Sequence, residues 1–104
     1  MAEEYRIVLQ PAAYEGMEAA YNYIEQESLT KAQQWANGLM DSINSLQTYP
    51  ERCSLAPEDE YFPQQIRQLL YRSTSGVYRI LFTVSEDAVV VLYIRHSAQR
   101  MVTP

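Results

Sequence analysis

The sequence is poor in the residues that build metal centres, disulfides and phosphate-binding loops. It contains one cysteine, one histidine and three glycines among 104 residues. Cys53 has no second cysteine to pair with, and one cysteine with His96 supplies too few ligands for a zinc site. The glycines are scattered, so they form no glycine-rich loop of the kind that holds phosphate groups. We therefore expect no metal ion, no cofactor and no internal disulfide.

Long hydrophobic runs are also missing. The longest run of large apolar residues is Val89–Ile94, whereas a membrane-spanning helix needs about 20 such residues. The first residues, MAEEYRIVL, lack the basic start and apolar centre of a secretory signal peptide. Together with the lone cysteine, these features predict a cytoplasmic protein. A hydrophobic content of 47% and a length of 104 residues fit one domain with its own core, spanning residues 1–104.

Positive charge is scarce and unevenly placed. Lys31 is the only lysine, and the formal net charge is −5. Residues 1–60 contain eleven acidic and three basic residues, whereas residues 61–104 contain five arginines and two acidic residues. This asymmetry either separates two surfaces with different functions or simply reflects acidic helices followed by strands that carry arginine.

Two amphipathic helices are predicted in the first half of the chain. Apolar side chains recur at steps of three and four in residues 11–27, and Pro11 stands where the first helical turn tolerates proline. A second apolar stripe follows, where either Ser28 or Thr30 can cap the helix, and Pro50 ends it. The short connection between the two stripes predicts an antiparallel helix hairpin.

Strands are predicted on both sides of the helices. Residues 5–9 form a short apolar run, and three runs rich in Val, Ile, Leu and Tyr occupy residues 66–72, 77–84 and 89–96. The last three are joined by connections so short that they must form an antiparallel meander. Residues 50–64 have three prolines, four acidic residues and no periodicity, which predicts a surface loop.

The predicted fold class is α+β with the order β-α-α-β-β-β. The N-terminal strand precedes an antiparallel helix hairpin, and this hairpin packs on one face of a small antiparallel sheet that includes the C-terminal three-strand meander.

Alternation along the strands predicts which side chains face the helices. The more apolar set of the third and fourth strands is assigned to the helix side: Tyr78, Ile80, Phe82, Val84, Val90, Leu92 and Ile94. The remaining side chains then share an open face: Arg79, Leu81, Thr83, Val91, Tyr93 and Arg95. Arg67 could point either way. Because one helix pair covers only one face, this mixed surface predicts a partner chain or a substrate, with a homodimer interface or a plain solvent face as alternatives.

Several short motifs follow one another along nearly the whole chain. The first strand ends in Pro-Ala-Ala and is followed by YNYIEQES, a Trp-bearing second helix and SLQTYPERCSLAPE. The second half contains YRILF, a short acidic turn, VVVLYIRH and a terminal arginine. In this order the motifs resemble the RelE/ParE toxin superfamily of type II toxin–antitoxin systems. The PERC…APED loop and the IRH ending are more similar to the ParE branch than to the mRNA-cleaving RelE branch.

The resemblance implies a toxin, often part of a plasmid stabilization module, that is neutralised by a cognate antitoxin whose C-terminal segment wraps it. In the ParE branch the implied target is DNA gyrase, inhibited by binding alone. The alternatives are a ribosome-dependent mRNA endonuclease of the RelE type and a non-toxic interaction domain of the same fold. The expected antitoxin- or target-binding residues lie on the open face and just beyond it: Arg79, Leu81, Val91, Tyr93, Arg95 and Arg100.

Whether the protein is an enzyme is left open by the sequence. RNA cleavage would require cations at the phosphate and groups that accept and donate protons. The candidates are three arginines, Arg67, Arg79 and Arg95, and three acid–base groups, His96, Tyr93 and Tyr71. Alternation places His96 on the face opposite Arg95, and a histidine at a strand end is more often structural. The net acidity also disfavours an RNA target, because phosphate contacts dominate such binding.

Overall fold

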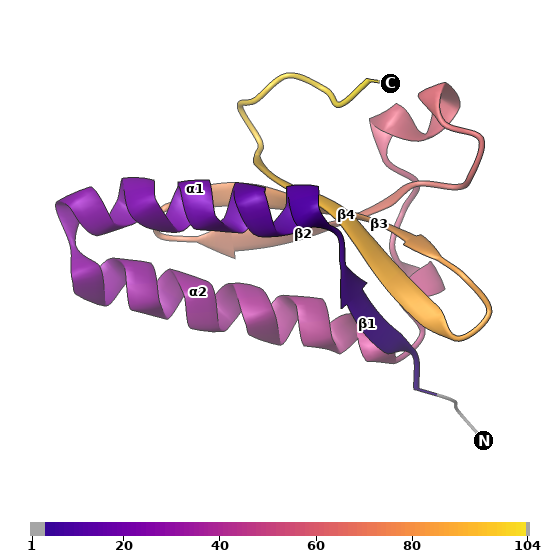
Figure 1. The fold of residues 1–104 in the computed structure, drawn as a ribbon, viewed down its shortest axis with the longest axis horizontal. Coiled ribbons are helices and arrows are strands. Elements are labelled where there is room, and N and C mark those ends of the chain that lie inside the picture. Colours follow the sequence, from indigo (N-terminus) through magenta and orange to yellow (C-terminus); the bar gives the residue numbers. More distant parts are fainter. Residues whose placement is uncertain (1–3, 104) are drawn as a thin grey trace.

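A computed structural model describes residues 4–103 of the chain. Its elements are β1 (Arg6–Leu9), α1 (Pro11–Glu27), α2 (Leu29–Asn44), β2 (Arg67–Ser73), β3 (Gly76–Val84) and β4 (Ala88–His96). Three short 3₁₀ helices lie between α2 and β2: η1 (Ser45–Gln47), η2 (Pro50–Arg52) and η3 (Pro57–Tyr61). The helix pair packs on one side of the sheet (Figure 1). The predicted α+β fold with the order β-α-α-β-β-β is confirmed.

The four strands form one sheet in the order β1-β4-β3-β2. The meander is antiparallel, as predicted. β1, however, runs parallel to β4 and pairs Arg6–Leu9 with Ala88–Val91. The sheet is therefore mixed, and the expectation of a wholly antiparallel sheet is wrong at this edge. The sequence could not place β1, because the long helical connection that follows it fixes neither its neighbour nor its direction.

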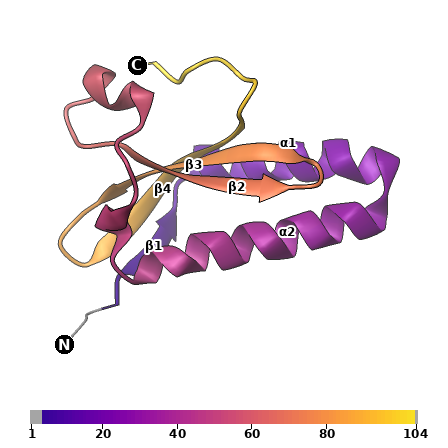
Figure 2. The ribbon, with the colours of Figure 1, turned by 180° about the vertical axis from the view of Figure 1, so that it is seen from behind.

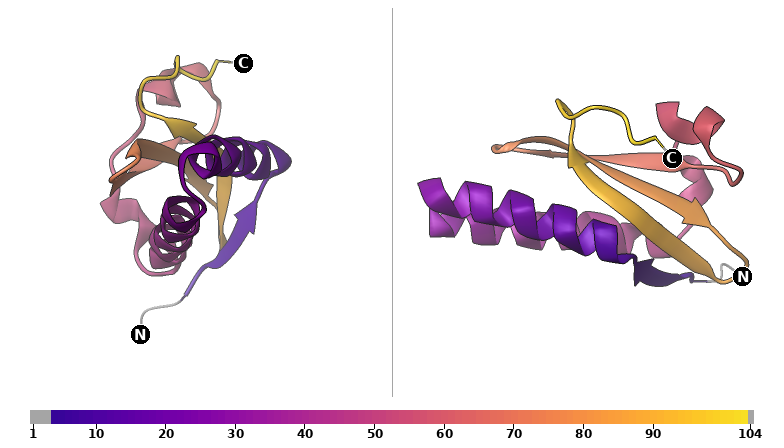
Figure 3. Two further views of the ribbon diagram at one scale, coloured as in Figure 1. Left: turned by 90° about the vertical axis from the view of Figure 1, so that its left-hand side faces the viewer. Right: turned by 45° about the horizontal axis from the view of Figure 1, so that its top comes forward.

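The two helices form the predicted antiparallel hairpin. Ser28 is extended and separates them, and its hydroxyl oxygen accepts a hydrogen bond of 3.2 Å from the Lys31 N–H. Ser28, rather than Thr30, is thus the N-cap of α2. From this residue α2 runs back beside α1, and the two helices are seen side by side and nearly end-on in Figure 3, left. No helix in the described part of the chain is long and apolar enough to span a membrane.

The core lies between the helix pair and the sheet. Trp35, Leu39 and Ile43 of α2 are buried in one cluster with Ile80 and Phe82 of β3. Complete burial of an aliphatic or aromatic side chain of this size stabilises a fold by about 1.5–3 kcal/mol. The helix-facing side chains predicted for β3 are confirmed by this cluster.

A β-bulge interrupts the alternation of β4. Leu81 pairs with Tyr93 and Phe82 pairs with Val91, so Leu92 is an extra residue between the two pairs. An inserted residue reverses the direction of every side chain before it, because side chains alternate strictly along a strand.

The bulge corrects the predicted facing of three residues. Val91 is fully buried in the helix-side core together with Val89. Leu92 instead packs with Leu81 on the other face. The expectation that Val91 lies on the open face, and that Val90 and Leu92 face the helices, is therefore wrong. Strict alternation along a sequence cannot show where a residue is inserted.

The second face of the sheet is covered in part by the chain itself. Ala56, Ile66 and Leu81 are buried in a small cluster, and the Ala56 N–H donates to the Ile66 carbonyl at 2.7 Å. The view from behind shows η3 and the C-terminal segment together above the strands (Figure 2). Residues 50–64 are thus a covering segment with two 3₁₀ helices and not merely a surface loop. Over this area the predicted need for a second molecule is wrong.

Candidate functional site

Arg79 and Arg95 stand opposite each other on β3 and β4. Their neighbours Ile80 and Ile94 are buried in the core, so both arginines extend from the face away from the helices. Arg79 is 8% exposed, whereas Arg95 is half-buried. The two guanidinium groups share a sheet position but differ in what surrounds them.

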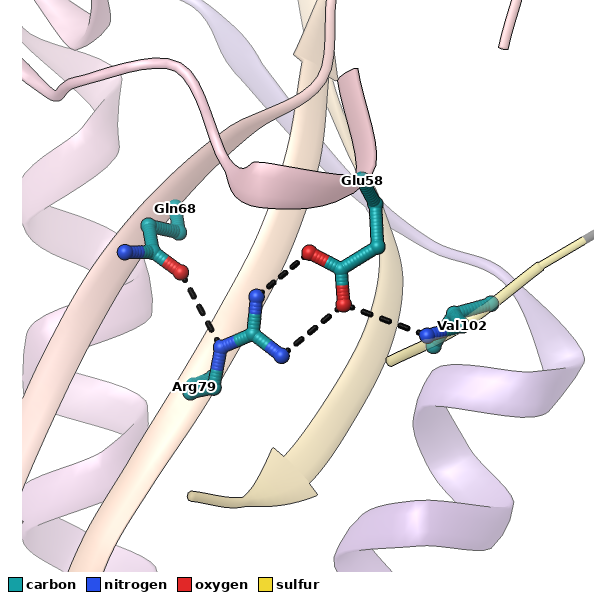
Figure 4. Close-up of polar contacts among 4 residues, drawn as sticks. All are labelled: Glu58, Gln68, Arg79 and Val102. Atoms are coloured by element: carbon teal, nitrogen blue, oxygen red, sulfur yellow. Dashed lines mark hydrogen bonds and ion pairs between the residues drawn. The ribbon is translucent and has the colours of Figure 1, made fainter. Parts of the chain in front are cut away.

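Arg79 is fully occupied by partners within the chain (Figure 4). Both its terminal nitrogens donate to the Glu58 carboxylate, with Nη1 at 2.8 Å from Oε2. Its Nε donates to Gln68 Oε1 at 3.0 Å. The Val102 N–H also donates to Glu58 Oε2, at 3.2 Å. We call these four residues the Arg79 clasp, because they fasten η3 and the C-terminal segment to β2 and β3.

Glu58 carries its charge inside the protein, with 0% of its surface exposed. Burial by itself raises the pKa of this carboxyl group. The hydrogen bonds from Arg79 and Val102, with the positive charge of Arg79, outweigh burial and hold the pKa below its ordinary value of 4.5. The clasp is therefore a buried ion pair with satisfied hydrogen bonds. Removing one member of such a pair typically costs about 3–5 kcal/mol.

Arg95 instead borders a groove of about 690 Å³ between α1 and the end of β4. Its Nε is buried and has no hydrogen-bond partner among residues 4–103. We call this hollow the Arg95 groove. One wall consists of α1 residues that are small, aromatic or, at Glu15, acidic: Ala12, Glu15, Gly16, Ala19, Ala20 and Tyr23. The other wall consists of Tyr78, residues 93–96 and Gln99.

The groove exists because β1 is short and α1 comes close. β1 pairs with Ala88–Val91 only. Beyond Val91, the edge of β4 that faces away from β3 has no strand paired with it within the described chain. α1 lies along that edge, and a Cβ atom at Gly16 would overlap the Ile94 carbonyl oxygen. Glycine at position 16 therefore allows the close approach of α1 to β4 beside the groove.

His96 turns the chain from β4 into the C-terminal segment. Its Nδ1 accepts the Ala98 N–H at 3.0 Å, and its own N–H donates to Gln99 Oε1 at 2.7 Å. Its ring contacts the helix-facing ring of Tyr78 edge to face, with centroids 5.0 Å apart. As alternation predicts, His96 and Arg95 leave the strand on opposite sides. These contacts give His96 a structural role at the strand end.

The remaining catalytic candidates, Arg67 and Tyr71, are hydrogen-bonded to backbone carbonyl groups of the chain itself. Arg67 Nη1 donates to the Cys53 carbonyl at 2.6 Å. The Tyr71 hydroxyl donates to the Trp35 carbonyl at 3.0 Å, and burial raises the pKa of Tyr71. Of the six groups proposed for RNA cleavage, three line the Arg95 groove: Tyr93, Arg95 and His96.

The expected binding face is therefore much smaller than the sequence suggested. Leu81 and Val91 are 1% and 0% exposed, and Arg79 is enclosed by the clasp. Tyr93 and Arg95 alone among the expected sheet residues reach the groove. Arg100 is exposed but follows the last strand, so it does not belong to the sheet face.

Sequence reasoning missed Glu58 and the α1 wall of the groove. Glu58 lies in an aperiodic acidic loop, where nothing marks one carboxylate as buried. Ala12, Glu15 and Ala19 recur on one side of α1, which could have indicated a second helix face without large side chains. In the described residues, no group of three or more His, Cys, Asp or Glu side chains could hold a metal ion.

Comparison with known proteins identifies the family to which the chain belongs. Residues 7–101 match the family described as the ParE toxin of the type II toxin–antitoxin system, parDE. No curated protein matches the chain. A solved structure described as "Chromosomal ParDE TA system from P. aeruginosa" aligns with a TM-score of 0.70 and 17% identity, covering 89% of this chain and 96% of that chain. That structural likeness shows the shared fold, and the resemblance to the ParE branch noted in the sequence is confirmed. Because the family match covers nearly the whole chain, the protein belongs to the ParE toxin family of type II toxin–antitoxin systems.

Proposed function

We propose that the protein is held inactive by a cognate antitoxin, and that the free protein inhibits DNA gyrase by binding it. The family supports an antitoxin partner, since the similar solved structure is described as a ParDE toxin–antitoxin system. Inhibition by binding requires an accessible, shaped surface and no bond-making groups. The Arg95 groove is such a surface.

One observation carries the preference for binding over catalysis. Arg79, the most central cation of the sheet, is closed inside the clasp by Glu58. An arginine that stabilises a phosphorane must reach the phosphate with free donors, whereas all the donor groups of Arg79 bond within the chain. Arg67 and Tyr71 are likewise engaged in contacts with the chain's own backbone.

A supercoiling assay tests the target. Purified protein is added to DNA gyrase with relaxed plasmid and ATP, and the supercoiled product is measured over a wide range of protein concentration. We expect supercoiling to fall as the concentration rises and to recover when the antitoxin is added. Unchanged supercoiling at every concentration would remove gyrase as the target.

Growth on induced expression tests neutralisation. We expect expression of this chain alone to arrest growth, and co-expression of the antitoxin encoded by the neighbouring reading frame to restore it. Normal growth without antitoxin would instead support a non-toxic interaction domain.

A ribosome-dependent mRNA endonuclease remains the second candidate for one reason. Tyr93, Arg95 and His96 border the same groove, so a cation and two groups able to exchange protons line one surface. The discriminating measurement is mapping of transcript ends in a translating extract. New cuts that depend on the protein, and that Arg95→Met abolishes, would favour the endonuclease.

A further inference from the structure

The Arg95 side chain contains a buried donor without an acceptor. Its Nε has no hydrogen-bond partner within the described residues, although an unsatisfied buried donor costs about 1–3 kcal/mol and more when it is charged. Native folds rarely leave such groups unpaired. Arg79, at the paired position, has an acceptor for each of its donor groups. The contrast points to an acceptor from another molecule for the terminal nitrogens of Arg95, which, unlike Nε, are not buried and have no partner within the described residues.

The groove places opposite charges on its two walls. Glu15 lines it from α1 and is exposed, and Arg95 lines it from β4. Gly16 follows Glu15 and lies close to Ile94, which precedes Arg95, so α1 and β4 approach each other beside the two charged residues. Neither residue takes part in any ion pair of the described chain. An occupant with charges complementary to both would bind in one direction only.

Between the charged walls the groove is apolar and shallow. Ala19 and Ala20, which we call the alanine floor, leave room on α1, and aromatic rings border the groove from Tyr23, Tyr78 and Tyr93. A volume of about 690 Å³ accepts several side chains of a peptide segment. Tyr23 is 74% exposed at the rim, where tyrosine commonly anchors a protein partner.

We propose that the Arg95 groove receives a segment of the antitoxin that sets apolar side chains on the alanine floor, a carboxylate on Arg95 and a cation on Glu15. This inference rests on the proposed function, since it takes the antitoxin as the partner. The carboxylate accepts hydrogen bonds from the terminal nitrogens of Arg95, and an arginine–carboxylate pair is strong and directional once the partner excludes water.

A second copy of this chain fits the groove less well. The exposed face of α1 carries Glu15, Glu18 and Glu25, and the first half of the chain has few basic residues to face Glu15. Two copies docked through this acidic helix would place like charges together, which disfavours association.

Calorimetric titration of the intact protein with the antitoxin from the neighbouring reading frame tests the inference. The groove variants are Arg95→Met, which removes the guanidinium, and Ala19→Trp, which fills the floor from an exposed position. The matched controls are Arg72→Met on β2 and Asn37→Trp on α2, both exposed and outside the groove. Thermal unfolding of each variant verifies that it is folded.

We expect the two groove variants to raise Kd by at least about tenfold, because they remove a desolvated charge contact or block the floor. The controls should stay within about twofold of the unchanged protein. Arg95→Lys should also bind more weakly, since lysine keeps the charge but lacks the planar pair of terminal nitrogens that matches a carboxylate.

Three outcomes would overturn the inference, and each has its own signature. If the unchanged protein binds the antitoxin and all variants bind equally well, the groove is not the binding site, although the proposed function stands. If the unchanged protein does not bind the antitoxin at all, both this inference and the proposed antitoxin partner are contradicted. If sedimentation shows a dimer that Arg95→Met dissociates, the occupant is a second copy.

Discussion

Arg79 and Arg95 occupy paired positions on one sheet face, but the chain closes over the first and leaves the second open. η3 and the C-terminal segment cross the sheet above β2 and β3, where Glu58 meets Arg79. At the C-terminal end of β4, α1 lies along the strand, and its small residues leave a groove. Residue type and strand position therefore did not decide the role of either arginine. The segments that cross above them did.

The largest expected effect comes from breaking the clasp. Arg79→Met leaves the Glu58 carboxylate buried and unpaired, and we expect it to lower the free energy of unfolding by about 3–5 kcal/mol. Arg95→Met removes a buried donor that lacks a partner, so it should not lower the free energy of unfolding. Urea denaturation at neutral pH measures both variants.

A double variant separates the charge effect from general damage at this site. Because Met at both positions leaves no buried charge, Arg79→Met with Glu58→Met should be more stable than Arg79→Met alone. A double variant that is no more stable than the single one would contradict the buried ion pair as the source of the effect. Equal losses of unfolding free energy in Arg79→Met and Arg95→Met would contradict the proposed difference between the two arginines.

Acid should loosen the clasp. The pKa of Glu58 is lower in the folded protein than its ordinary value of 4.5. The stability that follows is fully present above the unfolded-state pKa and is lost as the pH falls through the folded-state pKa. We expect the deficit in Tm of Glu58→Gln, measured against the unchanged protein, to shrink from pH 7 towards pH 3.

The matched comparison for this pH series is Arg95→Met. Its Tm should follow that of the unchanged protein at every pH, because Glu58 keeps all its partners in this variant. A deficit of Glu58→Gln that stays constant with pH would argue against ionisation of Glu58 as the linked event.

A smaller effect is expected where the C-terminal segment joins the clasp. Val102 is 8% exposed, and its N–H donates to Glu58. Val102→Ala keeps that donor, whereas Val102→Pro removes it. Because hydrogen bonds to charged groups contribute about 1.5–3 kcal/mol, Val102→Pro should lose more unfolding free energy than Val102→Ala by roughly that amount. Equal losses would mean that the segment is held by the apolar contact of Val102 alone.

The smallest expected effect lies away from both arginines. Tyr49 is 66% exposed and has a left-handed backbone with φ of 46°. Glycine adopts this conformation without steric cost, so Tyr49→Gly should raise stability by up to about 1 kcal/mol. Tyr49→Ala removes the same ring but keeps the strain, and it should give no such gain in Tm. Antitoxin affinity should be unchanged in both variants.

The sequence predicted the elements well because their signals are local. Steps of three and four gave α1 and α2, and short connections gave the antiparallel meander. The direction of β1, the bulge at Leu92 and the closure over Arg79 depend on contacts between distant segments. Glu58 lies 21 residues from Arg79 in the chain, and no periodic pattern joins the two. Arg95 and Tyr93 of the predicted site could be found from the sequence, because side chains alternate regularly along β4 beyond the bulge.

Hydrogen exchange of the protein with and without its antitoxin tests most directly which of the two arginines meets the partner. Bound antitoxin should slow exchange of backbone amides along the Arg95 groove, in residues 12–23 and 93–99, because a covered edge opens less often. Amides around Glu58, Arg79 and Val102 should exchange as they do in the free protein. Protection or loosening at the Arg79 clasp, with no change along the groove, would contradict this account.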